Sequence, residues 1–153
     1  MDATSSPSRG TRDDVKRALH LWRDREDHFR IDGYRGTGPV DSVRRIKGCG
    51  AATILTAPHA VKHMRDGKTK SEDRGTGSLC EALAVVLSVD GIAVSGPQAG
   101  DPNWDDTPGP FKLALFELLR PDSVVIDLHG MKDEHGVDVC IGRGSTPSRP
   151  HAR

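Results

Sequence analysis

Two short apolar segments that each reach a histidine constrain the fold of this chain most. Leu55–Ala60 reads Leu-Thr-Ala-Pro-His-Ala, and Ile126–Met131 reads Ile-Asp-Leu-His-Gly-Met. Each segment is an apolar run that stops at a histidine and is broken by Pro or Gly, a pattern typical of buried strands in parallel sheets. Open α/β sheets bind their ligands at the carboxyl ends of the strands. We therefore expect His59 and His129 to meet at a ligand-binding edge.

The rest of the chain alternates between helical and strand patterns. Apolar spacing predicts helices over Thr11–Arg23, Ser78–Leu87 and Pro110–Leu119, and β-branched runs predict strands at Ala51–Thr56, Gly91–Ser95, Ser123–Leu128 and Val137–Ile141. This alternation predicts an α/β fold with a single domain over residues 11–143. The polar residues 63–77 predict an exposed loop, and residues 1–10 and 144–153 predict a disordered leader and a disordered tail.

Composition excludes several classes of function. The 153 residues carry 22 basic and 22 acidic side chains, so no net field favours nucleic acid or an anionic membrane. No apolar run approaches the roughly 18 residues of a membrane span, and the leader lacks the apolar core of a signal peptide. We expect a cytoplasmic protein that acts on a small molecule, with its oligomeric state open. Cys49, Cys80 and Cys140 form no CxxC spacing and are expected to be small buried hydrophobic residues.

The two strand-end histidines suggest a catalytic metal site. Catalytic zinc usually takes three protein ligands and leaves one position open. The third ligand is expected to be a carboxylate, either Glu72 or Asp73, which are adjacent in the sequence. Asp127 precedes His129 by two residues and could hold the outer ring nitrogen of His129 or of His59. The remaining histidines are expected to be ordinary surface residues: His20, His28, His63 and His151.

Three motifs together resemble the N-formylglutamate amidohydrolase-like family, whose fold is similar to that of the zinc carboxypeptidases. They are Ala57–Ala60, Asp73–Leu79 and Asp127–Gly130, and the resemblance spans roughly Thr53–Arg143. In that family a Pro-His pair ends one strand, an acidic residue begins a helix and an Asp-x-His ends a later strand. The resemblance implies a three-layer α/β sandwich with a mostly parallel mixed sheet, similar to the zinc exopeptidases. It also implies a zinc hydrolase of an amide bond in a small substrate that bears a carboxylate.

Carried over residue by residue, the resemblance makes His59, Asp73 and His129 the metal ligands, with Glu72 as the alternative acid. Asp127 would orient one of the histidines. Zinc is the ion that the resemblance implies, although a His/His/carboxylate site also accepts manganese, cobalt or iron.

The chain departs from the family at the general base. Zinc hydrolases of this kind use a glutamate from the carboxy-terminal part, and no acidic residue lies beyond Asp138. Asp133 and Glu134 are the only local acids, and His135 is the group that could transfer a proton instead. The alternatives are therefore a catalytically impaired metal- or ligand-binding module of the same fold, or a shortened chain whose exposed sheet edge invites pairing.

Substrate-binding residues are expected around the metal site. Arg65 or Arg143 would meet a substrate carboxylate. Asp101 and Asn103, with Trp104, would line the site from the loop after the neighbouring strand. The alternative interpretation is a turn stabilised by Asp and Asn side chains, with Trp104 packed onto the core.

Overall fold

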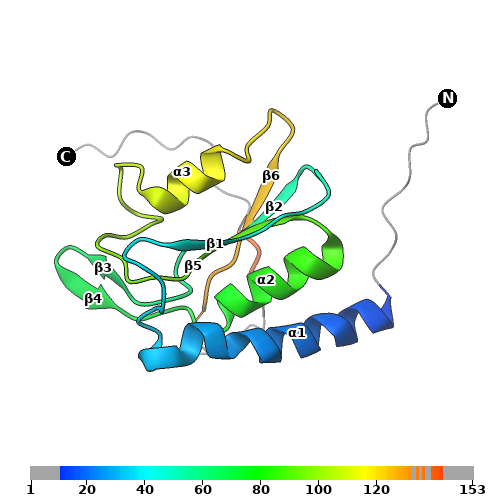
Figure 1. Cartoon of the computed structure of the whole chain (residues 1–153), viewed down its shortest axis with the longest axis horizontal. Coiled ribbons are helices and arrows are strands. Elements are labelled where there is room, and N and C mark those ends of the chain that lie inside the picture. Colours follow the sequence, from blue (N-terminus) through cyan, green and yellow to red (C-terminus); the bar gives the residue numbers. More distant parts are fainter. Residues whose placement is uncertain (1–10, 132–133, 135, 137–138, 143–153) are drawn as a thin grey trace.

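A computed structural model describes residues 11–131, 134, 136 and 139–142 of the chain. Its centre is a four-stranded sheet in the order β1-β5-β2-β6, drawn in Figure 1. The strands are β1 (Val43–Ile46), β2 (Thr53–Ala57), β5 (Asp90–Val94) and β6 (Val124–Asp127). β2 is parallel to both β5 and β6, and β1 pairs antiparallel with β5. The predicted α/β class with a mixed, mostly parallel sheet is therefore confirmed.

Helices cover both faces of the sheet. α1 (Arg12–Arg30) packs along α2 (Thr76–Leu87), α2 packs on β2 and β5, and α3 (Pro110–Phe116) contacts β5 and β1. Figure 1 shows α3 on one side of the sheet and α2 with α1 on the other. Helix α1 is longer than predicted. It begins at a capping box, in which the side chains and backbone of Thr11 and Asp14 bond reciprocally.

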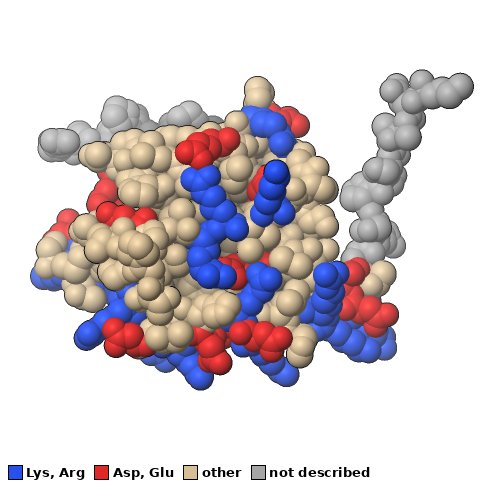
Figure 2. All heavy atoms as spheres, in the orientation of Figure 1, with Lys and Arg blue, Asp and Glu red and all other residues tan. Residues whose placement is uncertain are grey.

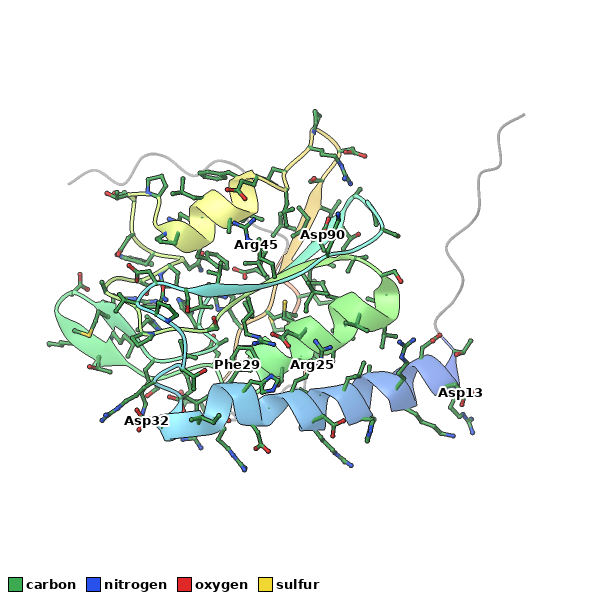
Figure 3. All side chains as sticks on the ribbon, in the orientation of Figure 1. Asp13, Arg25, Phe29, Asp32, Arg45 and Asp90 are labelled. Carbon is green, nitrogen blue, oxygen red and sulfur yellow. The ribbon has the colours of Figure 1, made fainter. Side chains whose placement is uncertain are left out.

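The contact between α1 and α2 places the start of α2 close to the end of β2. Figure 3 shows Phe29 and Arg25 pointing from α1 toward α2, and the Arg25 guanidinium pairs with the buried Glu81 carboxylate at 3.1 Å. Gly77 lies in the first turn of α2, where a Cβ would come within 2.5 Å of the Phe29 ring and 2.7 Å of Ala60 Cβ. Glycine is therefore needed for this close approach.

The segment after β2 is a hairpin rather than the predicted exposed loop. β3 (His63–Arg65) and β4 (Lys68–Lys70) pair antiparallel, with His63 opposite Lys70 and Arg65 opposite Lys68. The two-residue turn between them is Asp66-Gly67, and both residues have positive φ, 52° and 70°. Two positive φ angles in an Asp-Gly pair are typical of a type I′ hairpin turn.

The edge strand β6 differs from its neighbours in burial. Val124, Val125 and Ile126 are 40–56% exposed, and no helix contacts β6 in the part of the chain that the structure describes. Part of the strand predicted at Val137–Ile141 lies outside the described residues; 139–142 are described and form no strand. Thus the most β-like run of the sequence forms a strand with little cover.

Surface properties correct one further expectation. Cys80 is buried, whereas Cys49 and Cys140 are exposed, so the prediction of three buried cysteines is wrong for two of them. Figure 2 shows basic and acidic side chains interspersed over one face of the molecule. Among the residues described, no helix has the length and hydropathy that a membrane span requires.

Candidate metal centre

The sheet brings His59 and His129 together as the sequence predicts. His59 follows the last residue of β2 by two positions, and His129 follows the last residue of β6 by two. β2 and β6 are parallel neighbours with Thr56 opposite Asp127, so both strands end at the same edge. The two imidazole rings lie with centroids 5.0 Å apart and tilted by 59°.

Asp73 completes a first group at this edge. Its backbone N–H donates to the His59 carbonyl at 2.8 Å, which fixes the loop before α2 against the end of β2. Its Oδ2 lies 3.2 Å from His129 Nδ1 and 3.6 Å from His59 Nδ1. One ligand atom from each of the three residues lies within 4.8 Å of the other two, a spacing that could hold a metal ion.

The outer nitrogen of each histidine faces a second carboxylate. His59 Nε2 is 2.9 Å from Asp101 Oδ1, and His129 Nε2 is 2.9 Å from Asp127 Oδ2. Asp127 is held in turn by the Thr56 hydroxyl, which donates to Oδ1 at 2.7 Å. When Nε2–H donates to a carboxylate, the Nδ1 of a neutral imidazole carries a lone pair. Both lone pairs are then available near Asp73 Oδ2, which lies 3.2 Å from His129 Nδ1 and 3.6 Å from His59 Nδ1.

Three electron-pair donors at these distances require a positive charge between them. In the protein without an ion, protons supply it. Hydrogen bonds with Asp127 and then Asp73 raise the pKa of His129 to about 10. Burial opposes the charged form of His59, but its bonds with Asp73 and Asp101 outweigh burial and raise its pKa. Burial likewise opposes ionisation of Asp73, yet the bonds with His129 and His59 hold its pKa well below the ordinary value.

A second group shares His59 and is fully buried. It consists of His59, His63 and Asp101, and its spacing could also bind a metal. His63 Nε2 lies 3.4 Å from Asp101 Oδ2, and the His63 ring stacks on the His59 ring at 4.2 Å with an interplanar angle of 10°. The prediction that His63 is a surface residue is therefore wrong. Burial and the neighbouring His59 lower the pKa of His63.

The two groups differ in how many hydrogen bonds their aspartate carboxylate already accepts. Asp101 Oδ1 accepts from His59 and from the backbone N–H groups of Asn103 at 3.0 Å and Trp104 at 2.9 Å. Arg65 Nε donates to Asp101 Oδ2 at 2.5 Å. The in-plane lone pairs of the two stacked rings lie in nearly parallel planes. Both groups have the spacing of a metal site, and they differ in that the carboxylate of the second group already bonds with Arg65 and two backbone N–H groups.

The other predicted site residues fall in different places. Glu72 bonds with Arg74 at 2.9 Å and belongs to neither group. Arg65, bound to Asp101, also lies over the Trp104 ring with its guanidinium carbon 5.2 Å from the centroid. Asn103 Nδ2 lies 3.4 Å from His129 Nε2.

The alternative interpretation of this loop is half right: Asp101 Oδ1 accepts from the backbone N–H groups of Asn103 and Trp104 as in a side-chain-stabilised turn, but Trp104 is 66% exposed and does not pack onto the core. The predictions for His135, Arg143, Asp133 and Asp138 lie outside the described residues. Glu134 is described, but nothing places it in either His/Asp group.

A cavity of about 490 Å³ lies against the first group. Its lining combines His59 and Asp73 with residues of the hairpin and of the segment after His129: His63, Arg65, Lys70, Ser71, Gly130 and Met131. Asp73 is the only acid among these lining residues. A small molecule bound here would touch His59 and Asp73 of the first group and the basic hairpin together.

No protein-family model, curated protein or solved structure matches this chain. The resemblance described above therefore rests on its three motifs and on the arrangement into which the fold brings them.

Proposed function

We propose that this protein binds one divalent metal ion, zinc in the first instance, through His59, Asp73 and His129. We propose further that it is a metal-dependent hydrolase of an amide bond in a small molecule. The observation that carries the proposal is the close spacing of two Nδ1 atoms and one carboxylate oxygen, with each outer Nε2 facing its own aspartate. Two imidazoles and a carboxylate form a common ligand set of catalytic zinc, and such outer carboxylates orient the ligands.

A divalent ion in this set would polarise an amide carbonyl and activate water for attack. The protein's own residues have three tasks. Asp101 and Asp127 hold the two imidazoles in one orientation, so that the ligand atoms need no rearrangement. The backbone bond from Asp73 to His59 ties the acid to the same edge. The cavity beside the group gives a substrate access to it.

The amide-hydrolase class is supported by the family resemblance. The Pro-His pair, the acid before the helix and the Asp-x-His occur in the order typical of N-formylglutamate amidohydrolase-like proteins. An α/β fold with a mixed, mostly parallel sheet is compatible with the three-layer, zinc-exopeptidase-like sandwich that we propose for this chain. The same resemblance supports a substrate that bears a carboxylate.

A second candidate function is a metal-binding module without hydrolysis. The observation that favours it is that each aspartate near the group is already engaged: Asp73 with both histidines, Asp101 with His59 and Arg65, and Asp127 with His129 and Thr56. In the described part of the chain, no further acid lines the cavity as a general base. His135 stays our proposal for the proton-transfer group.

The first test is metal content by mass spectrometry on untagged protein purified without chelator. We expect about one zinc per chain in the wild type and almost none in Asp73→Asn or His129→Ala. His20→Ala, on the exposed surface of α1, is the matched control and should keep its zinc. His63→Asn separates the two groups, because it should keep its zinc only if the first group is the site. Folded wild type that takes up no zinc, even when zinc is added, would contradict the proposal.

The second test separates the hydrolase from the binding module. Zinc-loaded protein is incubated with a panel of N-acyl amino acids, and release of the free amine is followed with and without a chelator. Hydrolysis that stops on chelation and is absent in Asp73→Asn supports the hydrolase. Stoichiometric zinc with no turnover on any substrate supports the binding module.

A further inference from the structure

The β3–β4 hairpin presents a row of nitrogen-bearing side chains on one face. Side chains alternate between the two faces of a strand, so His63 and Arg65 share a face of β3, and Lys68 and Lys70 share the matching face of β4. His63, Arg65 and Lys70 line the cavity beside the metal group. The opposite face carries Met64 and Thr69, which line a separate cavity that His63 also borders.

The positive charge on this hairpin face is only partly neutralised. Arg65 is bound to the Asp101 carboxylate. Lys68 and Lys70 are exposed, and neither forms an ion pair with any other residue that the structure describes. Arg65 stands directly opposite Lys68, and like charges in that relation destabilise a sheet. A basic face next to a ligand cavity therefore points to a negatively charged ligand.

His63 adds an observation that is independent of charge. Its side chain is only 3% exposed, and although Nε2 lies 3.4 Å from Asp101 Oδ2, neither ring nitrogen forms a hydrogen bond with a residue that the structure describes. Buried polar groups nearly always have a partner, so an unpaired one signals a missing water, ion or ligand. The ring borders the cavity that Lys70 also lines, so a ligand in that cavity would lie beside both residues.

We propose that this hairpin face binds the carboxylate of the substrate, with His63 and Lys70 as specificity-determining residues. The inference rests on the proposed function, because it places the carboxylate beside an amide that the metal group would engage. His63 donates a ring N–H in its neutral form, and Lys70 supplies an ammonium opposite it in the hairpin register. Arg65, which the sequence predicts to meet a substrate carboxylate, also bonds with Asp101. It secures Asp101, and through Asp101 it secures His59.

The test compares two ligands that differ only at their far end. Succinohydroxamate and butyrohydroxamate carry the same metal-binding hydroxamate, but only the first ends in a carboxylate. Their dissociation constants are measured by calorimetry on zinc-loaded protein. We expect the wild type to bind succinohydroxamate at least about tenfold more tightly, as a charge-assisted hydrogen bond allows. Lys70→Gln and His63→Asn should each remove most of that preference.

Lys68→Gln is the matched control, because Lys68 lies on the same strand and is equally classed as exposed but does not line the cavity. It should change the preference by less than about twofold. Lys70 is exposed, so its variant keeps the inference testable if His63→Asn fails to fold. Equal binding of the two hydroxamates to zinc-loaded wild type, or a preference that survives both variants, would overturn the inference and leave the metal site standing. Absence of zinc binding would overturn the proposed function itself.

Discussion

His59 and His129 reach the same group from two strands that differ sharply in packing. β2, which precedes His59, is buried from Ile54 to Ala57 with at most 2% exposure. β6, which precedes His129, is exposed along its whole length. The carboxylates follow the same division, since Asp101 is fully buried and Asp127 is about one-third exposed. The group of His59, Asp73 and His129 therefore joins a well-packed part of the molecule to a poorly packed one.

This difference shows what each histidine does when no ion is bound. His59 belongs to a buried network with Asp101 and Arg65, so it supports the fold as well as the site. His129 is 37% exposed and bonds mainly with Asp127 and Asp73, so it supports little besides the site. An ion that holds both imidazoles would fasten β6 to the packed half of the sheet.

The largest expected effect separates the two histidines by stability. In the presence of a chelator, His59→Ala should lower the free energy of unfolding by about 2–4 kcal/mol, because it leaves the buried Asp101 and its neighbours short of a partner. His129→Ala should cost less than about 1 kcal/mol, because its polar contacts are partly exposed to solvent. Urea denaturation followed by circular dichroism measures both values. Equal losses of unfolding free energy in the two variants would show that His59 and His129 contribute equally to stability, which would contradict the difference in packing between β2 and β6.

A smaller effect concerns the backbone of β6 when zinc binds. The amides of Val124 and Leu128 donate to Ala52 and Thr56 of the neighbouring segment, at 2.9 Å and 2.8 Å. Zinc at about 100 times its dissociation constant stabilises the bound form by about 2.7 kcal/mol. If the local opening that exposes these two amides also releases the ion, their hydrogen exchange should slow by up to about 100-fold when zinc is bound. Asp73→Asn serves as the control, and slowing of exchange in that variant would contradict the role of the metal group.

The sequence predicts the two strands that carry the histidines better than the residues that surround them. Apolar runs that stop at a histidine identify β2 and β6 and place both imidazoles at one edge, because strand pattern and parallel pairing are local and general properties. The choice between Glu72 and Asp73 needs the fold. It depends on the bond from the Asp73 N–H to the His59 carbonyl, which no spacing in the sequence reveals.

Two features escape sequence reasoning for physical reasons. His63 lies in a polar, lysine-rich segment, and the fold buries it against the His59 ring and near the distant Asp101 carboxylate. The alternation His-Met-Arg, the Asp-Gly turn and Lys-Thr-Lys could have indicated the hairpin. The exposure of β6 could not be predicted from its sequence. An apolar run indicates that a strand can be buried, but whether it is buried depends on which helices pack on it. Among the described residues, no helix contacts β6.

The smallest expected effect is a pH dependence of the protein without metal. The pKa of His129 is raised from its ordinary 6.5 to about 10 by Asp127 and Asp73, so the folded state holds a proton that the unfolded chain releases near pH 6.5. The resulting stability is fully present below pH 6.5 and is lost as the pH rises toward 10. Because His129 is more than one-third exposed, screening reduces this loss to the order of 1 kcal/mol.

Chemical denaturation in a chelator at pH 6.5 and pH 9.5 measures that loss, and His129→Gln should flatten most of it. Asp73 contributes with the opposite sign. Its pKa is lowered by His129 and His59, so its stabilisation is present above pH 4 and is lost as the pH falls further. The metal-free protein should therefore be most stable between about pH 4 and pH 6.5, where the carboxylates are ionised and His129 is protonated. Stability that rises from pH 6.5 to 9.5 would show that His129 lacks these two partners in solution, and with them the link between β6 and the packed half of the site.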